Sequence, residues 1–273
     1  MKTVKFTRTD VPDELWERVR PCLPPWPPRP SGGRPPNPDR VVLSGIVYRL
    51  RTGCPWKAIP AEFGSGATCH RRFAEWTEYG VFRKLWEDLL REYHAELGAG
   101  LDWCSLDSAS VKAPKRGDQT GPNPTDRAKL GSKRHVLTDR RGVPLALTIT
   151  GANVHDKWMA GETLDEVALR ASRGPRRPKN LCLDKGYDYQ DTEQQVRERR
   201  VIPHIRRRGE QPLLGCVFGV ARRWVVERTN SWHNRFRALL IRWENYAERY
   251  LALCELASAL IVFRHIFKVQ MRF

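Results

Sequence analysis

The chain has 273 residues, of which 40% are hydrophobic and 29% charged, with a formal net charge of +17 and a pI near 10.0. This composition is typical of a folded protein rather than a disordered one. A basic excess of this size favours nucleic acid or an anionic membrane surface as partner. No apolar run approaches the roughly 20 residues that a bilayer-spanning helix needs, and the N-terminal segment lacks the apolar core of a signal peptide. We therefore expect a cytoplasmic location and no membrane partner.

The length favours one small and one medium domain over a single large one. Residues 1–97 carry 16 basic and 12 acidic side chains, whereas residues 98–273 carry 32 and 19. We therefore expect the second, more basic part to hold nucleic acid. The 7 cysteines are scattered without a C-x-x-C pair, so their spacing signals neither a disulfide framework nor a zinc site.

The first 97 residues are predicted to form a small all-helical domain of the helix-turn-helix type. A Pro-rich connection over 23–38 cannot be helix or central strand, because proline lacks the backbone N–H that both need. After the turn at Gly53 and Pro55, basic residues gather near the start of a later helix, which could enter a DNA major groove. Any small helical bundle would show similar apolar stripes. The candidate DNA contacts in this part are His70, Arg71 and Arg72.

From residue 101 the pattern changes to short strands. The segment LDWCSLD predicts a first strand, and KRHVLTD and VPLALTIT predict a hairpin around the turn DRRG, where Gly142 allows the required backbone angle. This order predicts an α/β architecture with a mixed sheet flanked by helices, and it is the order of ribonuclease-H-like domains. The final apolar helix should pack on the body, although a dimer contact is an alternative. The elements expected after the hairpin are a helix near 158–171, the strand NLCLD, a helix near 189–200, the strand VIPHI, a long helix over 222–243 and the final helix over 246–267.

Asp107 and Asp184 are both predicted to end apolar strands, in the segments CSLD and LCLD. Carboxylates at the C-terminal ends of neighbouring strands point into the crevice where α/β sheets bind ligands. A single aspartate in such a place more commonly caps a turn. Two such aspartates are stronger evidence for a ligand site than one, because burying both carboxylates without a cation or another partner would be costly. Asp102, which begins the first strand, is a weaker alternative to Asp107. Asp188, which lies beyond the strand NLCLD, is a weaker alternative to Asp184.

The third acid stands in RRWVVERTNSWHNRFR, residues 222–237, which has five arginines and a single carboxylate, Glu227. Helical spacing places Glu227 on the polar face of the predicted helix. It could form a surface ion pair with Arg223, worth only about 0.3 to 0.5 kcal/mol, or complete a metal site with the two aspartates. Mg²⁺ prefers oxygen ligands, and two ions about 3.5 to 4 Å apart can activate the attacking oxygen and stabilise the leaving one.

Four segments of the chain, in order, resemble the bacterial insertion-sequence DDE transposases of the insertion-sequence-five group, within the wider four/five class. They are RVVLSGIVYRLRTGCPWKAIPAEFG, GSKRHVLTDRRGVPLALTITGANVHD, LDKGYD and RRWVVERTNSWHNRFR. The resemblance covers nearly the whole chain. It implies that Asp107, Asp184 and Glu227 are the catalytic DDE ligands of Mg²⁺ or Mn²⁺, held as two ions on a ribonuclease-H-like fold.

Further residues are candidates for DNA contacts, some of them through the family's signature. Arg223 matches the arginine of the family's tyrosine, arginine, glutamate and lysine signature, but Val220 and Asn234 stand at the tyrosine and lysine positions. Arg235 or Arg237 could replace the missing lysine. His155 and Asp156 could line the site or stabilise their loop, and Trp224, Trp232 and Trp243 could stack on flipped bases or belong to the core. Arg223 and Asn234 are themselves candidate DNA contacts, and the remaining ones are Arg228, Lys133 and Arg134.

The expected activity is that of a transposase, which binds the terminal inverted repeats of its element, cuts a strand at each end and joins the freed 3′-hydroxyl to target DNA. The expected partners are double-stranded DNA and a second copy of the chain, as a homodimer or larger assembly, since two ends must be held together. The alternatives are a ribonuclease-H-like nuclease without strand transfer and an inactive DNA-binding regulator.

Overall fold

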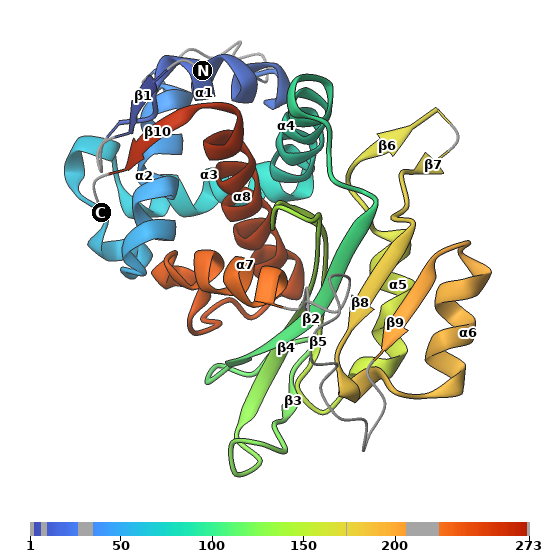
Figure 1. Ribbon diagram of the computed structural model, residues 1–273. Coiled ribbons are helices and arrows are strands. Elements are labelled where there is room, and N and C mark those ends of the chain that lie inside the picture. Colours follow the sequence, from blue (N-terminus) through green and yellow to red (C-terminus); the bar gives the residue numbers. More distant parts are fainter. Residues whose placement is uncertain (1–2, 7–9, 27–34, 173, 206–223, 272–273) are drawn as a thin grey trace.

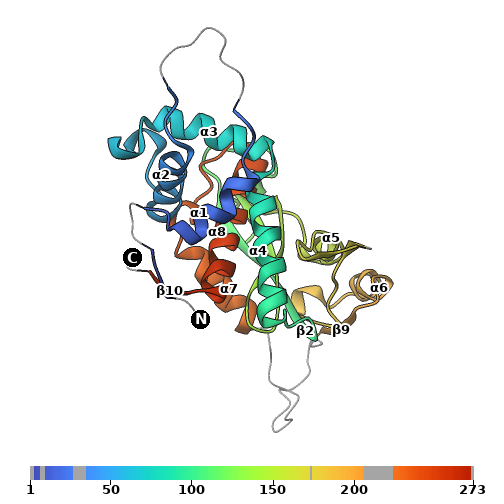
Figure 2. The ribbon, with the colours of Figure 1, turned by 90° about the horizontal axis from the view of Figure 1, so that it is seen from above.

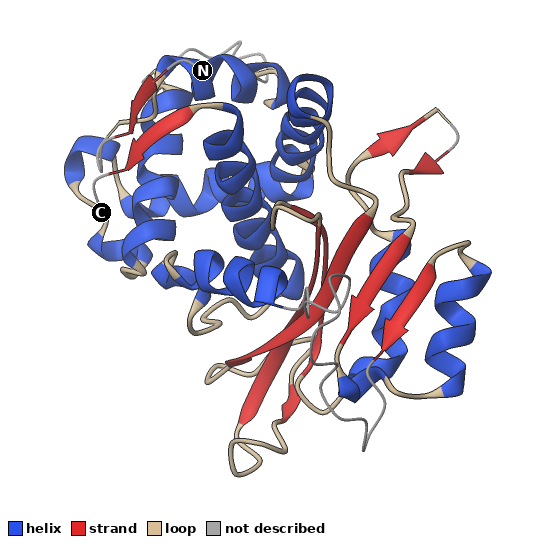
Figure 3. Cartoon of the chain, viewed as in Figure 1, coloured by secondary structure: helices blue, strands red, loops and turns tan. Residues whose placement is uncertain are grey.

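A computed structural model describes residues 3–6, 10–26, 35–172, 174–205 and 224–271 of the chain. A mixed sheet stands between two groups of helices (Figures 1 and 3). The group on the first face comprises α1 (Asp13–Val19), α2 (Asp39–Thr52), α3 (Gly66–Glu78), α4 (Val81–Leu97), α7 (Trp224–Asn234) and α8 (Ala247–Ile266). The opposite face carries α5 (Met159–Asp165) and α6 (Gln190–Glu198), as the view from above also shows (Figure 2).

The six-stranded sheet has the strand order of a ribonuclease-H-like domain. Its members are β2 (Trp103–Lys112), β3 (Gly121–Pro122), β4 (Leu130–Thr138), β5 (Pro144–Gly151), β8 (Asn180–Leu183) and β9 (Ile202–Ile205). β5, β4 and β2 pair antiparallel, whereas β8 and β9 extend the sheet beyond β2 in parallel. Without the two-residue β3, the strands numbered along the chain therefore lie in the order 3-2-1-4-5. The predicted hairpin and mixed sheet are confirmed.

Two short strand pairs and several single turns of 3₁₀-helix lie outside this sheet in the described residues. β1 (Thr3–Phe6) and β10 (Lys268–Met271) pair in parallel, which brings the two ends of the chain together (Figure 1). β6 (Arg170–Ala171) and β7 (Gly174–Pro175) form a small antiparallel pair. Single turns of 3₁₀-helix are η1 (Arg20–Cys22), η2 (Trp56–Ala58), η3 (Ala61–Phe63), η4 (Asp156–Trp158), η5 (Lys185–Tyr187) and η6 (Arg237–Leu239).

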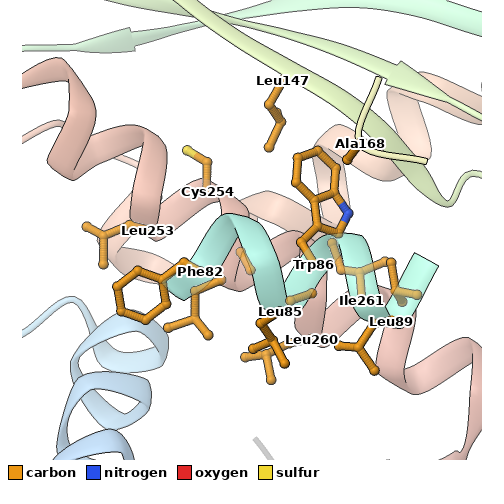
Figure 4. Close-up of a cluster of buried hydrophobic side chains, with 14 of the residues drawn as sticks. Phe82, Leu85, Trp86, Leu89, Leu147, Ala168, Leu253, Cys254, Leu260 and Ile261 are labelled. Atoms are coloured by element: carbon orange, nitrogen blue, oxygen red, sulfur yellow. The ribbon is translucent and has the colours of Figure 1, made fainter. Parts of the chain in front are cut away.

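The hydrophobic core centres on the contact between α4 and α8. In α4 the large apolar residues from Val81 to Tyr93 recur every three or four positions and are buried, as on the inner face of an amphipathic helix. α8 is apolar on most of its surface and is buried along nearly its whole length. Figure 4 shows side chains of α4 and α8 meeting under Leu147 of β5. The expected packing of the final helix on the body is confirmed.

One hydrophobic cluster runs from the N-terminal helices through α8 to the sheet. α4 ends at Leu97, and Gly98 follows with a φ of 66°, a left-handed conformation that glycine adopts without strain. The helix therefore stops where the boundary between the parts 1–97 and 98–273 is predicted. That division stays a prediction, since the shared core packs both parts together.

Two predicted helices are shorter than expected, and both end where the chain turns to pair with the sheet. The helix expected near 158–171 stops at Asp165, where the chain turns and the N–H of Ala168 donates to the carbonyl of Leu145 at 2.8 Å. The helix expected over 222–243 stops at Asn234. Beyond it the chain reaches β2, where the N–H of Arg242 donates to the carbonyl of Lys112 at 2.8 Å.

Within the described ranges, no helix combines the length and apolar character needed to cross a membrane. Part of the Pro-rich connection over 23–38 lies outside the described residues.

His233 joins α7 to α8 in a fully buried contact, in which its Nε2 lies 3.0 Å from the Oγ of Ser258. Burial, and then the nearby charge of Arg134, lower the pKa of His233 to about 3. In the unfolded chain the imidazole takes up a proton near pH 6.5. Between pH 3 and pH 6.5 the unfolded chain therefore binds more protons at this residue than the folded chain does. Stability contributed by the neutral imidazole is therefore present above pH 6.5 and lost as the pH falls toward 3.

We expect the free energy of unfolding of the wild type to fall more steeply than that of His233→Gln between pH 6 and pH 4. The expected difference in slope is about 1.4 kcal/mol per pH unit, the value for one proton. Urea denaturation at each pH measures both slopes. Equal slopes would contradict the buried, neutral imidazole.

Candidate active site

Asp107 lies in the middle of β2 and not at its end as predicted. β2 continues to Lys112 because it pairs with β4 from Ser105 to its end, with Asp107 opposite Val136 and Lys112 opposite Gly131. Its ladder with β8, however, covers only its first residues and stops at Ser105. Asp107 therefore lies just where β2 leaves its parallel neighbour. Its Oδ1 accepts a hydrogen bond from the N–H of Ser108 at 2.8 Å.

Asp184 directly follows β8, as predicted. Its backbone is still extended, and its Oδ1 accepts from the N–H of Gly186 at 2.8 Å, which begins the turn η5. In the parallel ladder Ser105 stands opposite Cys182. Continuing this register by two residues, past the end of the ladder, brings Asp107 level with Asp184 on the neighbouring segment. Because side chains alternate along a strand, the two carboxylates share one face of the sheet.

That face is the one covered by α7, the helix that carries Glu227. Arg134 of β4 stands opposite Ala109 of β2, and Ala109 lies two residues from Asp107, so Arg134 and Asp107 are on one face. The Nη2 of Arg134 donates to the Oδ1 of Asn234 in α7 at 3.0 Å. Glu227 is exposed on this helix. The fold thus sets all three predicted acids on the same side of the sheet.

The structure brings two of the three acids together but does not close a metal site. Nowhere in the part of the chain that is described do three histidine, cysteine or acidic side chains meet closely enough to hold one ion. Glu227 belongs to the first turn of α7, and its predicted neighbour Arg223 lies outside the described residues, as does Val220.

Tyr187, which the sequence analysis did not single out, is fully buried beside these carboxylates. Its Oη has no hydrogen-bond partner among the described residues. Burial raises the pKa of Tyr187 well above its usual value, and the carboxylates of Asp156, Asp107 and Asp184 raise it further. The phenol thus lies in the negative field of three acids. Its position in the segment LDKGYD, three residues after Asp184, is the sequence feature that could have identified it as a neighbour of the site.

Asp156 is held against the sheet on a turn after β5. The Nζ of Lys133 donates to its Oδ1 at 3.0 Å and to the carbonyl of Val154 at 2.9 Å. The Nδ1 of His135 lies 3.9 Å from the same carboxylate oxygen. Burial, the largest cause, lowers the pKa of His135 to about 4, so this imidazole is neutral at pH 7. Lys133, a candidate DNA contact, is thus mostly buried in an ion pair within the protein.

Two further candidate DNA contacts are structural residues. Arg134 is fully buried beneath α7, and Arg72 is buried with its guanidinium 2.6 Å from Asp39 and 2.7 Å from Glu75. Neither can reach a phosphate in this conformation, because contact with DNA would require a buried cation to leave its partners. The expectation that they bind DNA is therefore corrected.

The other candidates remain accessible to different degrees. His70 is half-buried and stacks on Trp56 with ring centroids 4.9 Å apart, and Arg71 is exposed and pairs with Glu75. Arg228 donates to the carbonyl of Arg141 at 2.6 Å. Its guanidinium also lies over the rings of Trp224 and Trp232. Exposed side chains at the end of α7 and just beyond it are those of Asn234, Arg235 and Arg237.

Comparisons with known proteins agree with the resemblance. Residues 11–86 match the family described as "Putative transposase of IS4/5 family", and residues 100–214 match "Transposase DDE domain". In Burkholderia cepacia, the "Putative transposase for insertion sequence element IS402" is 41% identical over 159 residues, which cover 57% of this chain and 72% of that protein. The "Insertion element IS402 uncharacterized 16.2 kDa protein" of the same organism is 39% identical over 118 residues, which cover 42% of this chain and 80% of that protein.

Among solved structures, the "Mos1 transposase paired-end complex with left transposon end" aligns with 94% of this chain and 87% of its own, at 11% identity and a TM-score of 0.27. A TM-score of 0.27 is too low to establish a shared fold, so the assignment of the fold class rests on the strand order of the sheet. The family rests on the sequence matches, which cover both the helical part and the part with the sheet. The chain belongs to the IS4/5 family of DDE transposases.

Proposed function

We propose that this protein binds the terminal inverted repeats of its insertion sequence, cuts a strand at each end and transfers the freed 3′-hydroxyl to target DNA. Asp107, Asp184 and Glu227 are the catalytic residues. The observation that carries this proposal is the register of β2 and β8, which brings Asp107 level with Asp184 on the face covered by the helix of Glu227.

The residues present fit a divalent metal. All three are carboxylates, the hard oxygen donors that Mg²⁺ and Mn²⁺ prefer. Burial is the main cause of the raised pKa of Tyr187, and the negative charges of Asp156, Asp107 and Asp184 raise it further, which supports a site with negative charge. Two such ions held by the three acids would supply positive charge to the attacking and leaving oxygens of the phosphodiester.

The protein's own residues would position the DNA for this chemistry. Arg235 and Arg237 are exposed just beyond α7, on the same segment as Glu227, where guanidinium groups could bind phosphates. Arg71 and His70 offer a second, smaller set on α3. Because cleavage at both ends of an element requires both ends to be held together, the active form is a homodimer or a larger assembly.

Replacing Asp184 with asparagine should abolish both chemical steps while leaving DNA binding intact. The amide keeps the shape of the side chain but loses the negative charge that holds a cation, so we expect cleavage and strand joining to fall to below about a thousandth of wild type. The measurement incubates the full chain with a labelled terminal-repeat duplex and Mg²⁺ or Mn²⁺.

Asp102→Asn and Asp188→Asn are matched controls, because both remove a nearby carboxylate outside the pair and should retain activity. Normal cleavage by Asp184→Asn would exclude the proposed triad. Cleavage without joining by the wild type would favour a nuclease, and binding alone would favour a regulator.

Asn234 occupies the signature's lysine position but has a different role in this chain. Its side-chain oxygen accepts from the buried Arg134, which binds α7 to β4. We propose that Asn234 fixes the helix of Glu227 and that Arg235 or Arg237 supplies the missing cation to the DNA.

Asn234→Lys should therefore destabilise the protein, because it leaves Arg134 without this acceptor and adds a second cation beside it. We expect the free energy of unfolding to fall by about 1 to 3 kcal/mol. Asn234→Asp keeps an acceptor at the same place and should remain within about 1 kcal/mol of wild type. Urea denaturation of the three proteins measures this, and a fully stable Asn234→Lys would argue against the proposed role.

A further inference from the structure

A second candidate binding site lies between the N-terminal helices and the segment that leads into α8. It is a cavity of about 790 Å³, within the usual size of small-ligand pockets. None of the three proposed catalytic acids lines it. Its walls come from the end of α2 and the turn after it, the start of α3, the loop after β2 and the segment 243–249.

The wall formed by residues 243–246 is rigidly held by Arg242. This arginine is fully buried, and each of its five N–H groups has an acceptor. The acceptors are the carbonyls of Glu244, Asn245 and Gln119, the Oγ of Ser132 and the Oδ1 of Asp118. The segment is therefore built to hold one conformation.

On this rigid segment two large aromatic rings remain open to solvent at the cavity. Trp243 is 45% exposed and Tyr246 is 58% exposed. The guanidinium of Arg249, also in the cavity wall, lies 4.8 Å from the ring centre of Tyr246. Aromatic rings held in place but left uncovered are suited to stack on a planar ligand.

The wall formed by α2 and the turn after it contains buried hydrogen-bond donors that have no acceptor among the described residues. Arg49 is 5% exposed, and its Nη2 donates to Glu244 at 2.7 Å, but its Nε and Nη1 have no partner among the described residues. The indole Nε1 of Trp56, which lies under the Arg49 guanidinium, has none there either. Buried donors without acceptors are rare in folded proteins, so these point to a ligand that carries acceptor atoms.

The positive charge of the cavity indicates a third property of the ligand, besides a planar shape and acceptor atoms. Lys57, Lys115 and Arg249 line it together with Arg49, whereas Glu244 is the one acidic residue among the described residues that line it, and it is paired with Arg49. Burial, the largest cause, lowers the pKa of His70, which leaves a neutral flat ring stacked on Trp56. The ligand should therefore be planar, rich in acceptors and negatively charged.

We propose that this cavity binds one unpaired nucleotide of a DNA strand, separately from the carboxylate site. The base stacks on Trp243 and Tyr246, its acceptor atoms receive hydrogen bonds from Arg49 and Trp56, and Lys57, Lys115 and Arg249 hold the phosphates. The inference rests on the proposed function as a DNA-processing enzyme and adds to it a preference for DNA with an unpaired end.

The test compares two forms of one terminal-repeat duplex, blunt or with a short single-stranded overhang carrying 2-aminopurine. Fluorescence anisotropy gives the Kd, and quenching of 2-aminopurine reports stacking. The wild type should bind the overhang duplex more tightly and quench its fluorescence. Trp243→Ala and Tyr246→Ala should each weaken overhang binding about tenfold, or about 1.4 kcal/mol, and reduce the quenching. Tyr79→Ala removes another exposed ring and should change neither.

Blunt-duplex binding is the internal control, since the proposed cavity receives unpaired nucleotides and both variants should keep it within about twofold. Equal affinity of the wild type for both duplexes, or equal losses on both in the variants, would overturn the inference while leaving the transposase proposal standing. If the wild type bound neither duplex, both proposals would fail.

Discussion

The proposed chemistry depends on one pairing, the short parallel ladder between β2 and β8. Its register sets Asp107 level with Asp184, and a shift by a single residue would turn one of the two carboxylates to the opposite face. β8 ends directly before Asp184, whereas β2 continues in its antiparallel ladder with β4. The pair of acids therefore lies where the sheet changes from parallel to antiparallel pairing, on a frame that cannot slip without losing its core contacts.

Several of the chain's arginines hold this frame together. Arg134 connects α7 to β4, Arg72 joins α3 to the start of α2, and Arg242 fixes the segment before α8. Each is buried and bonded, so the net charge of +17 is not all available to nucleic acid. The cations that remain at the surface include Arg235 and Arg237 beside the proposed site and Lys57 and Lys115 at the second cavity. The basic residues thus have two roles: buried arginines hold elements of the fold together, and exposed cations lie at the proposed DNA-binding surface.

Much of the fold could be predicted because its signals are local. The apolar stripe of α4, the hairpin around Gly142 and the apolar runs before Asp107 and Asp184 all depend on residues close in sequence. The end of α7 could not be predicted, because Asn234 is followed by an equally helical pattern and only contact with β2 draws the chain away. Burial of Arg72 and Arg134 depends on partners far along the chain, which no local pattern reveals.

The same limit applies to the sites. Each carboxylate of the proposed triad could be identified from the residues next to it in the sequence. The alignment of Asp107 with Asp184 could not, because it depends on the register between β2 and β8. The cavity that contains Arg49 and Trp243 is formed by segments almost 200 residues apart, so the sequence could show only its separate aromatic and basic parts.

If Asp107 and Asp184 together hold a divalent cation, Mn²⁺ binding should depend on both carboxylates. Electron paramagnetic resonance of the full chain with terminal-repeat DNA would count the bound ions without depending on catalysis. The account predicts that the wild type and the double variant of Asp102→Asn with Asp188→Asn bind Mn²⁺ alike, whereas the double variant of Asp107→Asn with Asp184→Asn loses this binding. Undiminished Mn²⁺ binding by the latter would contradict it.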